Sequence, residues 1–309
     1  MATPADAARP RLLLTGSTGF TGRYVRAELE RAGWHVTGLG HAAQAPAQAD
    51  AGELTVDLLD RDAVARAVAG VRPDAVIHLA AIAFVAHGDV DAIYRCNVVG
   101  TRHLLEALAA LPRAPRAVIL ASSANVYGNT TVEPIDEDTP PAPANDYAVS
   151  KLAMEYMARL WCGQLPITLV RPFNYTGVGQ SPQFLIPKIV DHFRRRADTI
   201  ELGNLQVWRE FQDVRAVAEC YRRLLEASPP PGSVFNLCSG QAWSLQEVLA
   251  MMESIAGYRI AVRVNPAFVR ANEVRRLVGS NARLAGAIGA LPAIPLQETL
   301  RWMYAAPAA

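Results

Sequence analysis

Three glycines near the start of the chain restrict its fold more than any other feature. Gly16, Gly19 and Gly22 are spaced G-x-x-G-x-x-G, after the apolar run at residues 11–15 and before a helical pattern at residues 21–32. In a strand–turn–helix unit, glycines let the backbone turn sharply and let phosphates approach the free N–H groups of the helix N-terminus. The pattern predicts a dinucleotide cofactor in contact with Gly16, Thr18, Gly19, Phe20, Thr21 and Gly22.

Short apolar runs alternate with helical patterns through the first half of the chain. Strands are expected at residues 34–39, 74–79, 116–122 and 167–171, and helices at residues 61–69, 90–111 and 145–162. This alternation predicts an α/β fold with a Rossmann-type, doubly wound parallel sheet covered by helices on both faces.

The second half of the chain is less regular. We expect a helix at residues 213–227, a strand at 234–237, and a helix at 244–256 that begins with a capping box. The predicted domains are a disordered leader at 1–10 and a dinucleotide-binding domain at 11–172, to which part of 205–240 returns. A smaller C-terminal α/β substrate-binding lobe is expected from residues 173–204 and 241–309.

Composition excludes several classes of partner. The 309 residues carry 30 Lys and Arg against 29 Asp and Glu, and this balance argues against a nucleic-acid-binding protein. No apolar run approaches the roughly 18 residues that a membrane span requires. The four cysteines form no CxxC pair and the histidines show no HExxH spacing, so we expect no metal site. A cytoplasmic location is expected, because the N-terminus has no signal-peptide pattern.

The end of the second strand bears on the choice of cofactor. An acidic residue there would accept from the ribose 2′-OH of NAD, but the chain has Gly40 followed by His41. We therefore expect NADP, with His41 facing the 2′-phosphate, and keep NAD as the alternative. Asp57 is expected to bind the adenine amino group or else to cap a helix. Small residues after the next strand leave room for the nucleotide, which adds Leu58, Leu79, Ala80 and Ala81 to the predicted cofactor contacts, whereas His78 is expected in the core.

Three further residues form a pattern suited to proton transfer. Tyr147 and Lys151 are four residues apart in the predicted helix and share one face. Ser123 ends a strand 24 residues earlier, at the edge where open α/β sheets hold ligands. A phenol titrates near pH 10, and a neighbouring ammonium lowers that pKa toward neutrality. We predict that Ser123, Tyr147 and Lys151 are catalytic.

Taken together, GSTGFTG, HLAA, SSANVYG, YAVSK and RPFN resemble the extended short-chain dehydrogenase/reductases, in the NAD-dependent epimerase/dehydratase family. The resemblance runs from Arg11 to about Trp302. It implies that Ser123, Tyr147 and Lys151 are the family's catalytic residues, and that Asn97 and Pro172 lie at the cofactor beside Tyr147 and Lys151. It also implies a homodimer built through a four-helix bundle.

In the second half, RPFNYTGVGQS, GNLQVWREFQDVRAV, VFNLCSG, NPAFVRANEV and LVGSN resemble the GDP-sugar subgroup of that family. The resemblance implies a nucleotide-sugar substrate in contact with Ser123, Asn125, Asn174, Lys188, Gly203, Arg209, Arg270 and Glu273. Asn125 stands where the 4,6-dehydratases carry glutamate, and asparagine cannot act as a general base. We therefore expect NAD(P)H-dependent reduction of the C4 ketone of a nucleoside-diphosphate 4-keto-6-deoxyhexose, GDP-4-keto-6-deoxy-D-mannose being favoured. A nucleotide-sugar 4-epimerase that uses NAD is the alternative, and a non-catalytic nucleotide-binding protein is a minor one.

Overall fold

The computed structural model describes residues 9–40, 52–83, 89–268 and 276–307. The chain forms two compact units. Unit 1 comprises Met1–Val126, Pro143–Arg171 and Tyr221–Phe235, and unit 2 comprises Tyr127–Ala142, Pro172–Cys220 and Asn236–Ala309. His41, Arg270 and Glu273 lie outside the described residues.

A seven-stranded sheet forms the centre of unit 1. Its order is β11-β6-β5-β4-β1-β2-β3, and the paired neighbours from β6 to β3 run parallel. The order reverses at β1 and β4, so their carboxyl ends flank the crevice where such folds bind ligands. The predicted doubly wound sheet is confirmed. The strands are β1 (Arg11–Thr15), β2 (His35–Gly40), β3 (Glu53–Thr55), β4 (Ala75–His78), β5 (Val118–Ala121), β6 (Ile167–Pro172) and β11 (Val234–Leu237).

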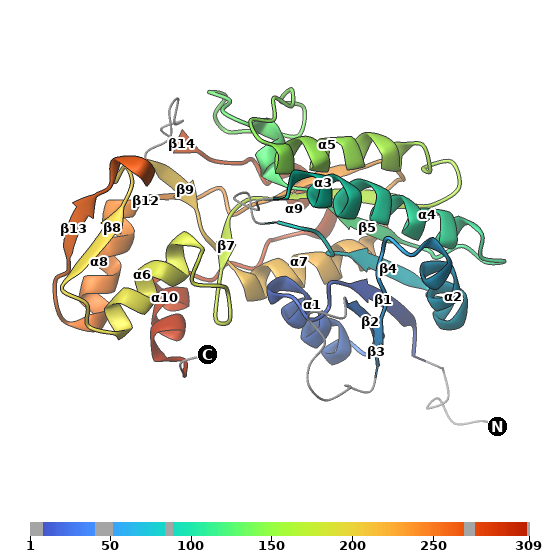
Figure 1. Ribbon diagram of the computed structural model, residues 1–309, viewed down its shortest axis with the longest axis horizontal. Helices are drawn as coiled ribbons and strands as arrows, with labels where there is room; N and C mark the ends of the chain where they lie inside the picture. Colours follow the sequence, from blue (N-terminus) through green and yellow to red (C-terminus); the bar gives the residue numbers. More distant parts are fainter. Residues whose placement is uncertain (1–8, 41–51, 84–88, 269–275, 308–309) are drawn as a thin grey trace. The chain divides into compact units, whose positions relative to one another are not determined.

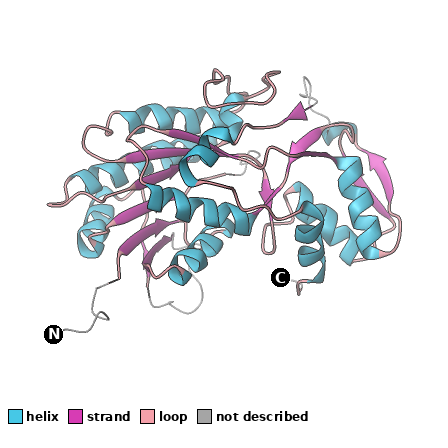
Figure 2. Ribbon diagram, turned by 180° about the vertical axis from the view of Figure 1, so that it is seen from behind, coloured by secondary structure: helices cyan, strands magenta, loops and turns pink. Residues whose placement is uncertain are grey.

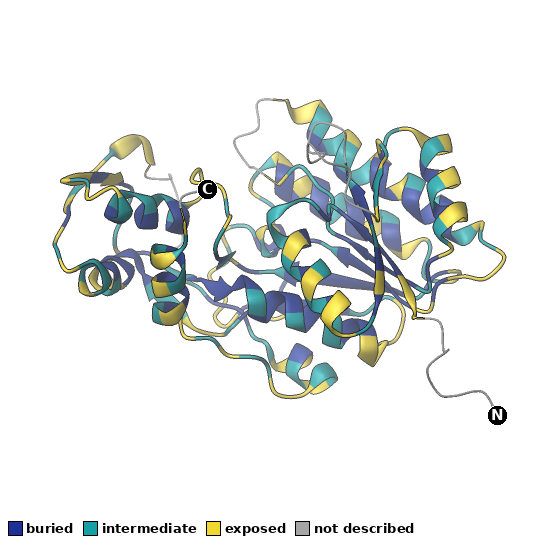
Figure 3. Ribbon diagram, turned by 90° about the horizontal axis from the view of Figure 1, so that it is seen from below, coloured by how far each residue is buried: buried dark blue, intermediate teal, exposed yellow. Residues whose placement is uncertain are grey.

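Helices cover both faces of this sheet. Figure 1 shows α3 (Val90–Tyr94), α4 (Thr101–Ala109) and α5 (Asp146–Arg159) on one face and α1 (Phe20–Arg31) on the other. α2 (Arg61–Val71) packs against α4. Seen from behind, the strands lie between two helical layers (Figure 2). The inner strands β1, β4, β5 and β6 are mostly buried (Figure 3), because a parallel sheet is covered by helices on both faces, whereas β3 at its edge is not.

The helix expected at residues 90–111 is divided into three pieces. Between α3 and α4, residues Arg95–Gly100 form a π-helical segment, η2. Such segments are rare and often occur at functional sites. Gly100 permits a close approach here, since a Cβ at this position would lie 2.9 Å from Leu58 Cβ. The apolar spacing of the sequence predicts helix but does not distinguish this wider turn from an α-helical one.

Unit 2 contains three small sheets, with orders β10-β7, β12-β9-β14 and β13-β8. The strands are β7 (Tyr175–Thr176), β8 (Thr199–Leu202), β9 (Trp208–Glu210), β10 (Gln212–Asp213), β12 (Ala242–Ser244), β13 (Ala261–Val264) and β14 (Arg276–Leu277). The helices of this unit are α6 (Leu185–Arg194), α8 (Leu245–Ala256), α9 (Ala282–Ile288) and α10 (Leu296–Ala305), while α7 (Val214–Ala227) belongs to unit 2 up to Cys220 and to unit 1 from Tyr221. A short 3₁₀ turn occurs in unit 2 at η4 (Pro266–Phe268), and another, η3 (Ala124–Tyr127), lies mostly in unit 1.

The core of unit 2 lies between α6, α8 and α10, where Ile189, Val248 and Leu300 are fully buried. The predicted capping box is confirmed: Ser244 Oγ accepts from Glu247 N at 3.1 Å, and the Glu247 carboxylate accepts from Ser244 N at 2.7 Å. This reciprocal pair satisfies backbone donors at the start of α8.

Candidate active site

The glycine loop is folded so tightly that two of its positions admit no side chain. A Cβ at Gly22 would lie 2.0 Å from Gly16 O, and one at Gly16 would lie 2.9 Å from Ala80 N. Gly19 is the N-cap of α1 and has no side chain to cap it, so the loop passes directly into the helix N-terminus, whose dipole favours a bound anion. Thr18 Oγ1 is buried and has no partner among the described residues. These features fit the phosphate groups of a dinucleotide.

The end of β2 differs from the expectation in one respect. A Cβ at Gly40 would lie 3.4 Å from Thr18 Oγ1, an ordinary van der Waals contact, and the neighbouring strand brings a carboxylate to the same place. Glu53 Oε2 accepts from Ser17 Oγ at 2.8 Å and lies 3.9 Å from the Cβ position of Gly40. The same carboxylate is paired with Arg26 of α1. The sequence argument missed Glu53 because it searched for an acid only at the end of β2.

Asp57 lies just after β3 and does not cap α2. Its Oδ1 accepts from Leu59 N at 2.9 Å, while the N-cap of α2 is Asp60, which accepts from Ala63 N at 2.9 Å. Leu58 is buried, whereas Leu79, Ala80 and Ala81 are partly buried after β4.

His78 lies in the core, as expected. It is 2% exposed, with Nδ1 2.6 Å from Thr15 Oγ1 and Nε2 2.8 Å from Thr101 Oγ1. Burial, and then the Lys151 charge, lower the pKa of His78 to about 3. The imidazole is therefore neutral at physiological pH.

The three predicted catalytic residues all belong to unit 1. Tyr147 and Lys151 lie on α5, which begins at the Asn145 N-cap, and they are 8% and 3% exposed. Lys151 Nζ donates to Ala121 O at 2.8 Å, at the end of β5. Burial lowers the pKa of Lys151 to about 8, although Cys96 and Glu155 act to raise it. Ser123 follows β5, and its Oγ accepts from Asn125 Nδ2 at 3.1 Å.

Asn97 connects the loop after β4 with α5. Its Oδ1 accepts from Ile82 N at 2.9 Å, and its Nδ2 donates to Ser150 Oγ at 3.0 Å. Ser150 precedes Lys151, so the π-helical turn that carries Asn97 is attached to the helix turn that carries the lysine. Asn97 is 1% exposed and its hydrogen bonds are internal.

The sequence argument missed a buried acid on the same helix. Glu155 lies four residues after Lys151, just as Lys151 lies four residues after Tyr147. It is 1% exposed and paired with Arg171. The repeated spacing of four was a readable signal that a third residue shares this face.

Unit 2 brings together two of the predicted substrate residues. Lys188 Nζ donates to Glu201 O at 2.8 Å and lies 4.6 Å from the ring centroid of Phe268. A Cβ at Gly203 would lie 2.6 Å from Phe268 O. Both residues therefore adjoin Phe268, a half-exposed ring that the sequence argument did not select.

Asn174 and Arg209, two more residues of the predicted substrate set, are more dispersed within unit 2, whereas Ser123 and Asn125 belong to unit 1. Asn174 is exposed between β6 and β7, and its carbonyl accepts from Gln212 N at 3.0 Å. Arg209 lies on β9 and donates to Trp208 O at 2.8 Å. Pro172, predicted at the cofactor, ends β6.

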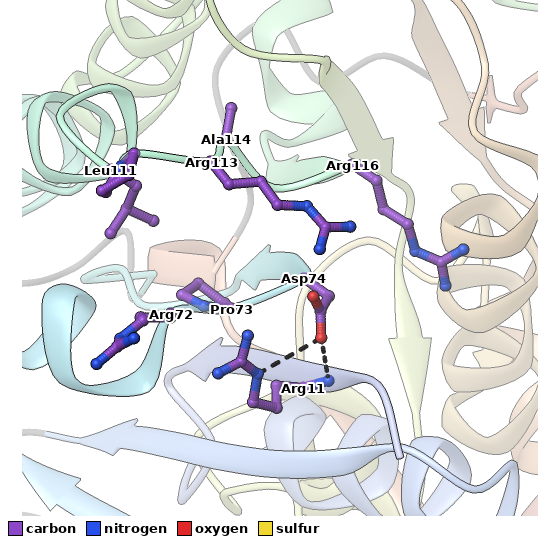
Figure 4. Close-up of a pocket in the computed structure, with 9 residues that line it drawn as sticks. Arg11, Arg72, Pro73, Asp74, Leu111, Arg113, Ala114 and Arg116 are labelled. Atoms are coloured by element: carbon purple, nitrogen blue, oxygen red, sulfur yellow. Dashed lines mark hydrogen bonds and ion pairs between the residues drawn. The ribbon is translucent and has the colours of Figure 1, made fainter. Parts of the chain in front are cut away.

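A cavity of about 250 Å³ lies at the opposite edge of the sheet, where β1 and β4 begin (Figure 4). It is lined by Asp74 and four arginines, of which Arg11 binds Asp74 through its backbone N at 2.8 Å. Arg72 and Arg113 follow the C-termini of α2 and α4, where positive charge stabilises a helix. We assign these arginines a structural role.

Two classes of site are not found in the described part of the chain. No helix there is both long and apolar enough to cross a membrane. No group of three or more metal-binding side chains occurs among the residues that were placed.

Comparison with known proteins finds relatives that align with nearly the whole chain. The chain is 34% identical over 304 residues to GDP-6-deoxy-D-mannose reductase from Pseudomonas aeruginosa, covering 94% of this chain and 95% of the relative. The solved structure of RMD from Pseudomonas aeruginosa complexed with NADPH is similar with a TM-score of 0.83 and 33% identity, over 96% of each chain. A structure from Burkholderia cenocepacia J2315 has a TM-score of 0.90 and 54% identity, covering 96% of this chain and 97% of that one.

The model of the NAD dependent epimerase/dehydratase family matches residues 12–238, most of the chain. That span contains the glycine loop, the end of β5 and α5, where the predicted cofactor and catalytic groups lie. The chain belongs to the NAD dependent epimerase/dehydratase family.

Proposed function

We propose that this protein reduces the C4 ketone of a nucleoside-diphosphate 4-keto-6-deoxyhexose, GDP-linked, with NADPH as the preferred coenzyme. The observation that carries the proposal is the set of Ser123, Tyr147 and Lys151 at the end of β5 and on α5, with Asn125 in place of a basic carboxylate. The similarity to a GDP-6-deoxy-D-mannose reductase and to a structure with NADPH supports the substrate and the coenzyme.

The bound coenzyme supplies the hydride, and the protein supplies the proton and the orientation. Tyr147 donates its phenolic proton to the oxygen that becomes the alcohol. The Lys151 ammonium would stabilise the phenolate that Tyr147 becomes and would bind the nicotinamide ribose of the coenzyme. Ser123 donates a hydrogen bond to the ketone oxygen, and a donor placed where negative charge develops contributes a few kcal/mol. Asn125 offers no base for dehydration.

The coenzyme is held by the groups described at the glycine loop. The backbone N–H groups at the start of α1 and Thr18 Oγ1 bind phosphate oxygens, and Asp57 accepts from the adenine amino group. In unit 2, Asn174, Lys188, Gly203 and Arg209 contact the nucleotide sugar. Arg270 and Glu273 are proposed for the same role on the basis of the family resemblance.

The decisive assay measures the oxidation of NADPH and of NADH through the loss of nicotinamide absorbance. GDP-4-keto-6-deoxy-D-mannose is the substrate, with the dTDP-linked ketosugar as comparison. We expect consumption with the GDP sugar, faster with NADPH. No consumption with either sugar would reject the reductase. Tightly bound NAD together with interconversion of C4 epimers would then support the 4-epimerase.

The catalytic role of Tyr147 is tested by a single substitution and a control. Tyr147→Phe removes the proton donor, so kcat should fall about 1,000-fold while the Kd for NADPH stays near the parent value. Tyr304 lies on α10, outside the predicted cofactor and substrate residues and outside α5, which makes Tyr304→Phe the control for loss of a phenol. Near-parent turnover in Tyr147→Phe would remove this residue from the mechanism.

We also propose that the protein is a cytoplasmic homodimer that pairs through α3, α4 and α5. Large apolar side chains are exposed along these elements and η2, namely Val90, Val99, Val149, Tyr156 and Leu160, the last with 80% of its surface exposed. Exposed apolar surface of this kind marks an interaction site. Light scattering should give a dimer for the parent and a monomer for Tyr156→Lys/Leu160→Lys, whereas a monomeric parent would reject the interface.

A further inference from the structure

A buried ion pair lies beside the proposed catalytic groups and takes no part in the steps above. Glu155 and Arg171 are 1% and 3% exposed. Arg171 Nε donates to Glu155 Oε1 at 2.8 Å, and Arg171 Nη2 donates to Glu155 Oε2 at 2.6 Å. The bidentate geometry fixes both side chains. Neither charge can lose its partner without leaving a buried ion uncompensated, which is strongly destabilising.

The pair also holds the end of β5. Ser122 Oγ, in a residue 4% exposed, donates to Glu155 Oε1 at 2.6 Å. The preceding carbonyl, Ala121 O, accepts from Lys151 Nζ at 2.8 Å. Two consecutive residues at the strand end are therefore bound to two residues one turn apart on α5. Ser123 comes next in the chain, so its position relative to Lys151 depends on both attachments.

The charges around Lys151 give Glu155 a second effect. The titratable groups that interact electrostatically with the ammonium are Glu155 on α5, Cys96 on η2 and His78 on β4. Tyr147 lies one turn before Lys151 on α5. Burial raises the pKa of the Cys96 thiol and lowers that of His78, so both are neutral near pH 7. The Glu155 carboxylate therefore supplies negative charge that acts to raise the pKa of Lys151, against the larger effect of burial, which lowers it.

We propose that Glu155 is a positioning residue: held by Arg171, it binds Ser122 and thereby fixes Ser123 relative to Tyr147 and Lys151 on α5. This inference rests on the proposed function. It assigns the ion pair to catalysis, beyond its evident contribution to the packing of α5 against the sheet.

The test compares four variants by kcat, by KM for the ketosugar and by the Kd for NADPH, each across pH. Glu155→Gln should lower kcat about 10- to 100-fold, because small displacements of catalytic groups have effects of this size. The alkaline limb of its kcat–pH profile should move to lower pH, because Lys151 loses the attraction of a negative charge. Glu155→Asp keeps a carboxylate, so it should recover part of the lost kcat and part of the shift in the alkaline limb.

Ser122→Ala keeps the ion pair and removes only its attachment to β5. It should lower kcat and leave the alkaline limb in place. Glu226→Gln is the control, because Glu226 forms an exposed i,i+4 pair with Arg222 on α7. This variant should match the parent in kcat, KM and Kd at every pH. The comparison therefore distinguishes the loss of an ordinary surface ion pair from the loss of the positioning role proposed for Glu155.

The proposal is overturned if folded Glu155→Gln keeps the parent kcat and pH profile. It is equally overturned if Glu155→Gln loses activity with an unmoved alkaline limb while Ser122→Ala is like the parent. Should Glu155→Gln fail to fold, Ser122→Ala decides, and a parent-like kcat rejects the proposal. Failure of the proposed function is visible earlier, as a parent that oxidises no coenzyme, and the same variants are then compared in the epimerase assay.

Discussion

The buried imidazole of His78 should make the stability of this protein sensitive to mild acid. Its pKa is about 3 in the folded chain against an ordinary value of 6.5. Below about pH 6.5 the unfolded chain binds a proton at His78 and the folded chain does not, so stability falls as the pH decreases. Between pH 7 and pH 5 the loss from this residue amounts to about 2 kcal/mol.

The perturbation that isolates this effect is His78→Gln. Glutamine does not titrate, and its amide can still reach the hydroxyls of Thr15 and Thr101, which lie 2.6 and 2.8 Å from the ring nitrogens. We expect the variant to be less stable than the parent at pH 7, because the fit is poorer. The gap should close by about 2 kcal/mol at pH 5.

Urea unfolding followed by tryptophan fluorescence measures that gap at each pH. His35→Gln, at an exposed position on β2, measures the effect of losing an imidazole from the surface over the same range. A gap between the parent and His78→Gln that is constant from pH 7 to pH 5 would refute the argument. It would mean that the folded chain accepts a proton at His78 as readily as the unfolded chain.

Three other predictions concern the cofactor site and unit 2. Gly22→Ala places a Cβ 2.0 Å from Gly16 O and should cost about 1–3 kcal/mol in the free energy of unfolding and weaken NADPH binding; unchanged thermal unfolding would contradict the close approach. Glu53→Gln removes a negative charge near Gly40, so the ratio of kcat/KM for NADPH over NADH should rise about tenfold, and an unchanged ratio would place the 2′-phosphate elsewhere. Ser244→Ala breaks the capping box of α8 and should lower the free energy of unfolding in urea by about 1 kcal/mol. Gln246→Ala, at an exposed position two residues further along, should have no effect.

The sequence predicted the sheet and its order of elements because the relevant signals are local. Short apolar runs that alternate with helical patterns mark the buried strands, and Ser244 with Glu247 marks a helix start. The positions of Tyr147 and Lys151 followed from a helical spacing of four. Such features involve residues close in sequence, and elementary geometry connects them to a structure.

The parts that escaped prediction involve contacts across the fold. Glu53 reaches the end of β2 from a neighbouring strand, and no count along the chain from Gly22 would find it. The π-helical turn around Asn97 depends on the tight packing of Gly100 against Leu58, which apolar periodicity does not record. Phe268 attracts attention only once Lys188 lies beside its ring.

The route of the chain through its two units has a consequence for how the protein is made. β11, the strand that completes the central sheet beyond β6, ends at Leu237. A ribosome therefore releases the long segment Pro172–Cys220 of unit 2 before the last strand of the sheet has been synthesised. During translation, β6 is an edge strand with unpaired backbone N–H and C=O groups until β11 is synthesised, and such an edge favours aggregation. Truncations that stop before residue 234 should accordingly give insoluble protein, however complete their glycine loop and catalytic helix.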